Sequence, residues 1–134
     1  MQTYTRALFD ANGECDTAAD GEVTQMGYEY YPECVEHVVR RVHESFHGEL
    51  LITENGIATD DDARRCDYIR TAVDGALRCK ADGIPVAGYL YWSMIDNFEW
   101  QSGYGMKFGL MSLNRETQEH TPKESLYVLG KYDR

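Results

Sequence analysis

Glu54 is the side chain whose surroundings most favour chemistry. It follows residues 50–53, a short apolar segment with a β-branched end, and it precedes Asn55 and Gly56, which tolerate positive φ and break the strand. The segment predicts a parallel strand that is covered on both faces. Enzymes with α/β folds keep catalytic groups where such strands end. Position alone still favours a solvated carboxylate beside a turn, because most carboxylates are surface groups.

A second segment, residues 88–100, gathers aromatic side chains and a carboxylate. Trp92 and Trp100 offer flat apolar faces for a ligand, and Glu99 offers hydrogen-bond acceptors beside them. Packing in the core is the alternative for both tryptophans. Trp100 is less suited to a core, because it adjoins Glu99 in a loop that is followed by three glycines.

Residues 50–58 and 88–100, in this order and spacing, resemble the retaining β-glycosidases of glycoside hydrolase family 1. The first segment resembles the family's nucleophile signature. The second contains Trp-Ser-x-x-Asp-Asn-Phe-Glu-Trp, which resembles its sugar-binding loop, and Gly103-Tyr104 and residues 107–110 follow in matching register. The resemblance extends over nearly the whole chain, and several motifs in order are more specific than Glu-Asn-Gly alone.

The resemblance implies a role for each of these side chains. Glu54 would be the nucleophile, and Trp92 the platform for the nonreducing sugar. Glu99 and Trp100 would bind hydroxyl groups of that sugar, and Phe108 would be a further aromatic lining residue. The resemblance implies neither a metal nor a cofactor.

Tyr4 is the candidate for support of the nucleophile. In the family that the chain resembles, an Asn-x-Tyr-Thr/Ser element closes the sixth strand, and its tyrosine hydrogen-bonds the nucleophile. Tyr4 matches that tyrosine by register, although Gln2 stands where the asparagine is expected. An ordinary tyrosine at a strand end is an equally good interpretation from the residues alone.

The resemblance also points to a missing group. Retaining hydrolysis needs a second carboxyl group that protonates the leaving oxygen, and the family carries it in an Asn-Glu-Pro element at the end of the fourth strand. No such tripeptide occurs in this sequence. Because general acid catalysis contributes about a hundred- to ten-thousand-fold, very weak or absent turnover is expected for this chain alone.

The rest of the sequence predicts elements that position these groups. Helical spacing of valines predicts a helix from Pro32 through Phe46, which Gly48 ends. Thr59 or Asp60 is expected to cap a second helix, near whose positive end acidic residues are favourably placed. The predicted buried stripe of this second helix is Ala63, Cys66, Ile69, Ala72, Val73, Ala76 and Leu77.

The second helix leads into another strand. Gly83 ends that helix, and residues 86–92 predict a strand parallel to the first. Residues 108–113 are expected to be extended. The sequence Thr121-Pro122-Lys123-Glu124 then predicts a capping box, with the proline at the first position of the last helix.

This alternation predicts an α/β fold. A complete eight-stranded barrel needs about 250 residues, whereas the chain has 134. Together with the resemblance, this predicts the C-terminal part of a (β/α)8 TIM barrel, from the end of strand six to helix eight. Residues 1–134 are expected to form a single partial domain in which the N-terminal part of the barrel is absent.

Composition narrows the class of function. A net charge of −10 disfavours nucleic acid and anionic membranes, whereas a neutral sugar is not repelled. Residues 1–20 contain no signal peptide pattern, so a cytoplasmic location is expected.

The four cysteines are expected to be packed as reduced thiols. His43-Glu44-x-x-His47 matches a zinc motif, but it abuts Gly48 and a solvated helix face is favoured.

These observations predict a retaining β-glycosidase, similar to β-glucosidases, that hydrolyses the O-glycosidic bond of a β-glycoside with Glu54 as nucleophile. The chain is expected to be a fragment that needs a missing N-terminal half or that associates with itself. A carbohydrate-binding or interaction module without catalysis is the alternative, and a zinc peptidase is a distant third.

Overall fold

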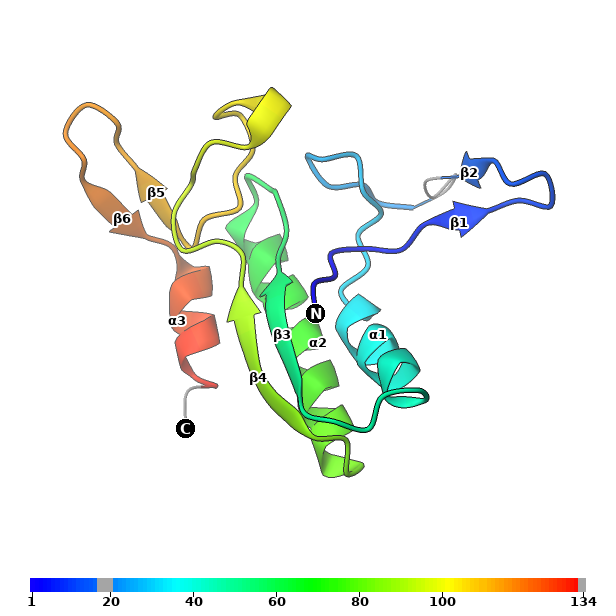
Figure 1. Ribbon diagram of the computed structural model, residues 1–134. Coiled ribbons are helices and arrows are strands. Elements are labelled where there is room, and N and C mark those ends of the chain that lie inside the picture. The colour runs from blue at the N-terminus through cyan, green and yellow to red at the C-terminus, as the bar shows by residue number, and fades with distance from the viewer. Residues whose placement is uncertain (17–20, 133–134) are drawn as a thin grey trace.

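Two parallel strands form the centre of the chain. In the computed structural model, which describes residues 1–16 and 21–132, β3 (Leu50–Asn55) pairs with β4 (Val86–Tyr91). The helix between them, α2 (Asp62–Ala81), lies behind both strands, and α1 (Cys34–His43) and α3 (Glu124–Gly130) pack on its two flanks (Figure 1). The predicted strand, helix and parallel strand are confirmed.

The first residues extend this sheet on the other side of β3. Gln2 forms a parallel bridge with Glu54, and the Thr3 amide donates to the Glu54 carbonyl oxygen at 3.2 Å. The Thr53 amide donates to the Met1 carbonyl oxygen at 2.8 Å. The start of the chain therefore runs alongside β3 in the same direction, and both segments end at the same edge.

The core lies between the sheet and the helices. One cluster joins β3 to α1 and α2 through Leu50, Ile52, Val39 and Tyr68, among others, and a second cluster beneath α3 contains Ile69, Leu110 and Val128. The opposite face of the sheet is open, because Leu51 is 42% exposed and Leu90 is 53% exposed. The prediction that residues 50–53 are covered on both faces is wrong, because no second layer lies over this face in the described residues.

The first helix is shorter than its sequence pattern predicts. It begins at Cys34 and ends at His43, so neither Pro32 nor Phe46 belongs to it. Glu44 and Ser45 continue as a turn that leads towards β3. The valine spacing located the buried face correctly, since Val35 and Val39 are fully buried.

The second helix is capped by a neighbour of the predicted residues. Asp61 accepts hydrogen bonds from the Ala63 and Arg64 amides at 3.0 and 3.3 Å. The helix ends as predicted before Gly83, which has φ +90°. Most of the predicted stripe is buried, but Ala63 and Leu77 are exposed.

The predicted capping box at the last helix is wrong. Pro122 lies in β6 (His120–Pro122), which pairs antiparallel with β5 (Met111–Leu113), and α3 begins only at Glu124. Lys123 occupies the cap position without a side-chain cap bond. Asp62 of α2 accepts the Ser125 amide at 3.0 Å instead.

Three loop regions lie at the end of the sheet towards which β3 and β4 point (Figure 1). They contain the short hairpin of β1 (Leu8–Phe9) and β2 (Cys15–Asp16), the 3-10 turn η1 (Trp100–Ser102), and the β5–β6 hairpin. Residues 17–20, which follow the first hairpin, lie outside the described part. Within the described residues, every helix is too short or too polar to span a bilayer.

Candidate active site

All six side chains predicted to form a site line one pocket. It has a volume of about 600 Å³ and lies at the carboxyl ends of β3, β4 and the first segment of the chain. The predicted lining residues are Tyr4, Glu54, Trp92, Glu99, Trp100 and Phe108. Sequence reasoning did not single out the lining residues Tyr28, Asn97 and Phe98.

Glu54 and Tyr4 are in direct contact within this pocket. The Tyr4 hydroxyl donates to Oε2 of Glu54 at 2.9 Å. Burial, followed by the hydrogen bond to Glu54, raises the pKa of Tyr4 well above its usual range. The hydroxyl therefore remains a neutral donor over the working pH range of ordinary enzymes. The ring of Tyr4 packs edge to face on Phe108, with ring centroids 6.2 Å apart.

Gly56 lets the end of β4 approach the end of β3. The Trp92 amide donates to the Asn55 carbonyl oxygen at 2.8 Å. A Cβ atom on Gly56 would lie 1.9 Å from the Trp92 carbonyl oxygen. The strand also continues through Asn55, and Gly56 has no positive φ. The sequence therefore identified this glycine correctly as special, but the reason is close backbone approach and not a turn.

Several aromatic side chains of the pocket are exposed. Trp100 is 76% exposed and Phe98 is 56% exposed. Trp92 is 36% exposed, so neither tryptophan belongs to the core, and the alternative of core packing is wrong. Glu99 lies half-buried between them in a tight turn, in which its amide donates to the Gly103 carbonyl oxygen at 2.6 Å.

Asp96 holds the base of this aromatic loop. It is buried, accepts the Gly109 amide at 2.8 Å and pairs with Lys123 Nζ at 3.1 Å. Lys123 also donates to the Gly109 carbonyl oxygen at 2.7 Å. Asp96 therefore has a structural role. Its place within the sequence motif did not reveal this role.

A second buried group lies beneath Glu54. Asn55 and Tyr68 are almost completely buried, and Asn55 Nδ2 donates to the Tyr68 hydroxyl at 2.9 Å. Asn55 Nδ2 also donates to the Thr3 carbonyl oxygen at 2.8 Å, and the Tyr68 hydroxyl donates to the Tyr4 carbonyl oxygen at 2.8 Å. Sequence reasoning treated Asn55 only as a strand breaker and missed Tyr68.

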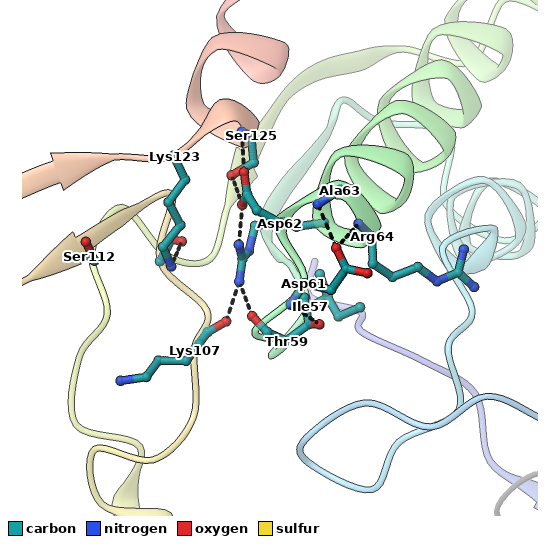
Figure 2. A network of polar contacts seen from close by, with 12 residues as sticks. Ile57, Thr59, Asp61, Asp62, Ala63, Arg64, Lys107, Ser112, Lys123 and Ser125 are labelled. Atoms are coloured by element: carbon teal, nitrogen blue, oxygen red, sulfur yellow. Dashed lines mark hydrogen bonds and ion pairs between the residues drawn. The ribbon is translucent and has the colours of Figure 1, made fainter.

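Arg65 joins the loops that follow β3 and β4. Its guanidinium is 1% exposed in an ion pair with Asp62, and Nη2 donates to the carbonyl oxygens of Thr59 and Lys107, the latter at 2.7 Å. Figure 2 shows Asp62 close to Ser125, with Thr59 and Lys107 converging from the two loops. Because Lys107 adjoins Phe108, this network fixes one wall of the pocket to the start of α2.

The possible zinc motif has no helical geometry. Since α1 ends at His43, His43 and His47 do not share a helical face, and their rings pack edge to face with centroids 5.0 Å apart. Residues 1–16 and 21–132 contain no cluster of three or more histidine, cysteine or acidic side chains arranged to hold a metal. Cys34, Cys66 and Cys79 are buried as small packed residues, whereas Cys15 is exposed.

Comparisons of the sequence with known proteins agree on one family. The family model described as glycosyl hydrolase family 1 matches residues 3–132. "Beta-glucosidase A" of Thermotoga maritima is 37% identical in an alignment of 114 residues that covers 78% of this chain and 26% of that protein. "Beta-galactosidase" of Saccharolobus solfataricus is 38% identical over 95 residues, which are 71% of this chain and 19% of that protein.

Solved structures agree with these relatives. The structure described as beta-glycosidase BGL167 superposes with a TM-score of 0.93 at 48% identity, over 99% of this chain and 32% of that chain. The family 1 b-glucosidase from Thermotoga maritima superposes with a TM-score of 0.87 at 33% identity, over 97% of this chain and 32% of that one. The chain therefore spans about a quarter of the first curated relatives and about a third of these structures.

Proposed function

Because the chain belongs to glycosyl hydrolase family 1 and matches part of the TIM-barrel fold of its neighbours, we propose that it is the part of a retaining β-glycosidase that carries the nucleophile, Glu54. The observation that carries this proposal is the contact between the Tyr4 hydroxyl and Glu54 in a pocket with exposed aromatic side chains. The β-glucosidase and β-galactosidase relatives support a β-glycoside as substrate.

In this proposal, a carboxylate oxygen of Glu54 attacks the anomeric carbon of the sugar. The bond from that carbon to the leaving oxygen breaks, and a covalent glycosyl ester forms, which water later hydrolyses with retention. The Tyr4 hydroxyl orients the carboxylate before the attack. Trp92, Trp100 and Phe108 supply apolar faces for the sugar, and Glu99 accepts hydrogen bonds from its hydroxyl groups.

The acid that protonates the leaving oxygen lies outside this sequence in our proposal. A retaining enzyme needs its second carboxyl group about 5 to 5.5 Å from the nucleophile. Glu99 also lines the pocket, but we assign it to sugar binding, and the sequence contains no Asn-Glu-Pro. We assign the first residues of the chain, which run alongside β3, to the end of barrel strand six. We assign β3 and β4 to strands seven and eight, and α3 to helix eight.

A mechanism-based probe tests the nucleophile without the acid. A 2-fluoro β-glucoside with a dinitrophenolate leaving group needs no protonation, because the phenolate departs with the bonding electrons. We expect the intact mass of the chain to increase by one fluoroglucosyl group, and peptide mapping to place that group on Glu54. Glu54→Gln should remain unlabelled, while Glu49→Gln, at an exposed position just before β3, should label like the wild type.

Two other results would decide against this proposal. Labelling of a different residue would remove Glu54 from the role of nucleophile. Saturable quenching of tryptophan fluorescence by the sugar, without any adduct, would favour a carbohydrate-binding module without catalysis. The exposed Trp100 and Phe98 are the observation that keeps this second function under consideration.

A further inference from the structure

The buried pair of Asn55 and Tyr68 lies on the opposite side of β3 from the pocket, yet it is connected to both partners of the contact between Tyr4 and Glu54. We propose that Asn55 and Tyr68 are positioning residues that hold the Thr3-Tyr4 backbone so that the Tyr4 hydroxyl meets Glu54. This inference rests on the proposed function and deepens it, because it explains how the nucleophile keeps its orienting partner.

The bonds of Asn55 define its orientation completely. The side chain is 0% exposed, and its Nδ2 donates to the Thr3 carbonyl oxygen and to the Tyr68 hydroxyl. Its Oδ1 accepts the Tyr89 hydroxyl at 2.6 Å. A carbonyl oxygen can only accept, so the amide nitrogen must face Thr3. A buried amide with its donors and its acceptor satisfied is held in one rotamer.

Tyr68 continues this network from α2 to the Tyr4 backbone. Its hydroxyl accepts from Asn55 and donates its single proton to the Tyr4 carbonyl oxygen at 2.8 Å. Burial raises the pKa of Tyr68 well above its usual range, so the hydroxyl stays a neutral donor. Within the described residues, the backbone ladder between the first segment and β3 ends at the Thr3 amide. Tyr68 therefore restrains the residue just beyond the ladder.

An irregularity near the end of β3 lets one dipeptide serve both sides. The register of β3 against β4 shifts between Ile52 and Asn55, so both of these residues are buried although they are three positions apart. Glu54 lines the pocket and accepts the Tyr4 hydroxyl, while Asn55 reaches the core and binds the backbone of the same segment. Tyr4 is thus held at its hydroxyl by Glu54 and at its carbonyl by Tyr68, which is itself fixed by Asn55.

Labelling kinetics with the fluoroglucoside test this inference. Tyr68→Phe removes one hydroxyl and keeps the ring, which packs edge to face on Tyr30. We expect the labelling rate at saturating probe to fall about tenfold, as small misplacements near reacting groups do, with little change in the half-saturating concentration. Tyr4→Phe should lower the rate similarly. Because both changes act through one contact, the double variant should be no slower than the slower single variant.

The control is Tyr30→Phe, which alters a neighbouring half-buried tyrosine outside the network and should label like the wild type. If Tyr68→Phe does not fold, Tyr89→Phe loosens the Asn55 amide from its other side and should also slow labelling without adding to Tyr4→Phe. In a wild-type chain that labels, an unchanged Tyr68→Phe rate or fully additive losses would overturn the positioning role alone. A wild-type chain that does not label would overturn the proposed function and this inference with it.

Discussion

At the scale of single residues, the pocket separates residues that hold the fold from residues that only face its open space. Trp100 is the clearest member of the second group, because its side chain is 76% exposed in a tight turn. Gly56 is the clearest member of the first, because backbone atoms of Trp92 occupy the space of its missing Cβ. The two residues predict opposite consequences of substitution.

Trp100→Ala should weaken sugar binding without weakening the fold. We expect the half-saturating concentration of the fluoroglucoside to rise about fivefold, since an aromatic contact surface of this kind contributes about 1 kcal/mol. The free energy of unfolding in urea should change by less than about 0.5 kcal/mol, as for other exposed positions. A large loss of stability with unchanged sugar affinity would contradict the assignment of Trp100 to the ligand.

Gly56→Ala should have the reverse effect. The added methyl group cannot avoid the Trp92 carbonyl oxygen without moving the end of β4, so we expect the unfolding free energy to fall by about 3 kcal/mol. Gly130→Ala is the matched control at the end of α3, where a Cβ meets nothing within 4 Å and φ is not positive. That variant should be neutral or slightly more stable in the same urea titration.

At this scale the sequence predicted which side chains gather in one pocket. Tyr4, Glu54 and the segment from Trp92 follow the ends of segments that run in the same direction, whereas Phe108 comes from the loop before β5. Asn55 and Tyr68 escaped prediction for a physical reason. Their partners are backbone carbonyl oxygens of Thr3 and Tyr4, which are more than fifty residues away and carry no signature in the sequence.

At the scale of elements, α2 organises the chain through two kinds of ion pair. The buried Arg65 pairs with Asp62, whose side chain is 26% exposed, whereas Arg70 and Asp67 repeat the same spacing on the exposed side of the helix. We expect Arg65→Ala to lower the unfolding free energy by about 3 kcal/mol, because it removes three buried bonds and leaves Asp62 without its cation. Arg70→Ala should cost less than about 1 kcal/mol. Equal losses in urea unfolding would contradict this difference.

Glu36 links α1 to α2 and should make their packing sensitive to acid. Hydrogen bonds from Arg78 and Arg40 hold the pKa of Glu36 below its usual value. A group with a lowered folded-state pKa adds stability that is present above its unfolded pKa and is lost as the pH falls through its folded pKa. We therefore expect the unfolding free energy to decrease below about pH 4.5. Glu36→Gln should remove this part of the decrease.

The matched control for that measurement is Glu44→Gln. Glu44 pairs with Arg41 at the end of α1, but both side chains are more than half exposed. Such a pair contributes little, so the variant should follow the wild-type pH curve. If both variants gave the same curve, the contact between α1 and α2 would not depend on Glu36.

The elements also show where sequence patterns fail. Helical periodicity located α1 and α2, but it could not place the start of α3, because Asp62 from the distant α2 supplies the cap and β6 takes Pro122 into a hairpin. Leu77 was expected in the buried stripe, yet it is 50% exposed and lines a second pocket of about 460 Å³ between α2, β4 and α3. The helical spacing placed Leu77 in the apolar stripe, but it could not show whether another element covers that position.

At the scale of the whole molecule, the uncovered surfaces of the two-stranded sheet favour association between chains. Leu51 and Leu90 are exposed on its open face, and a strand edge with apolar neighbours invites pairing with another chain. We expect the chain to associate at micromolar concentration in sedimentation velocity experiments. Leu90→Lys should reduce association, while Phe46→Lys, a change at a similarly exposed residue outside the sheet, should not. A monodisperse wild-type monomer with a sharp thermal transition would contradict this expectation.

Arg65 and Tyr68 leave α2 three residues apart, and each supports a different wall of the pocket. The Glu54 side and the aromatic side of the pocket are therefore both attached to one helix. If α2 shifted, both walls would move with it. Engineers describe such a part as a common datum, and in this molecule it fixes the spacing of two loops that lie far apart in the sequence.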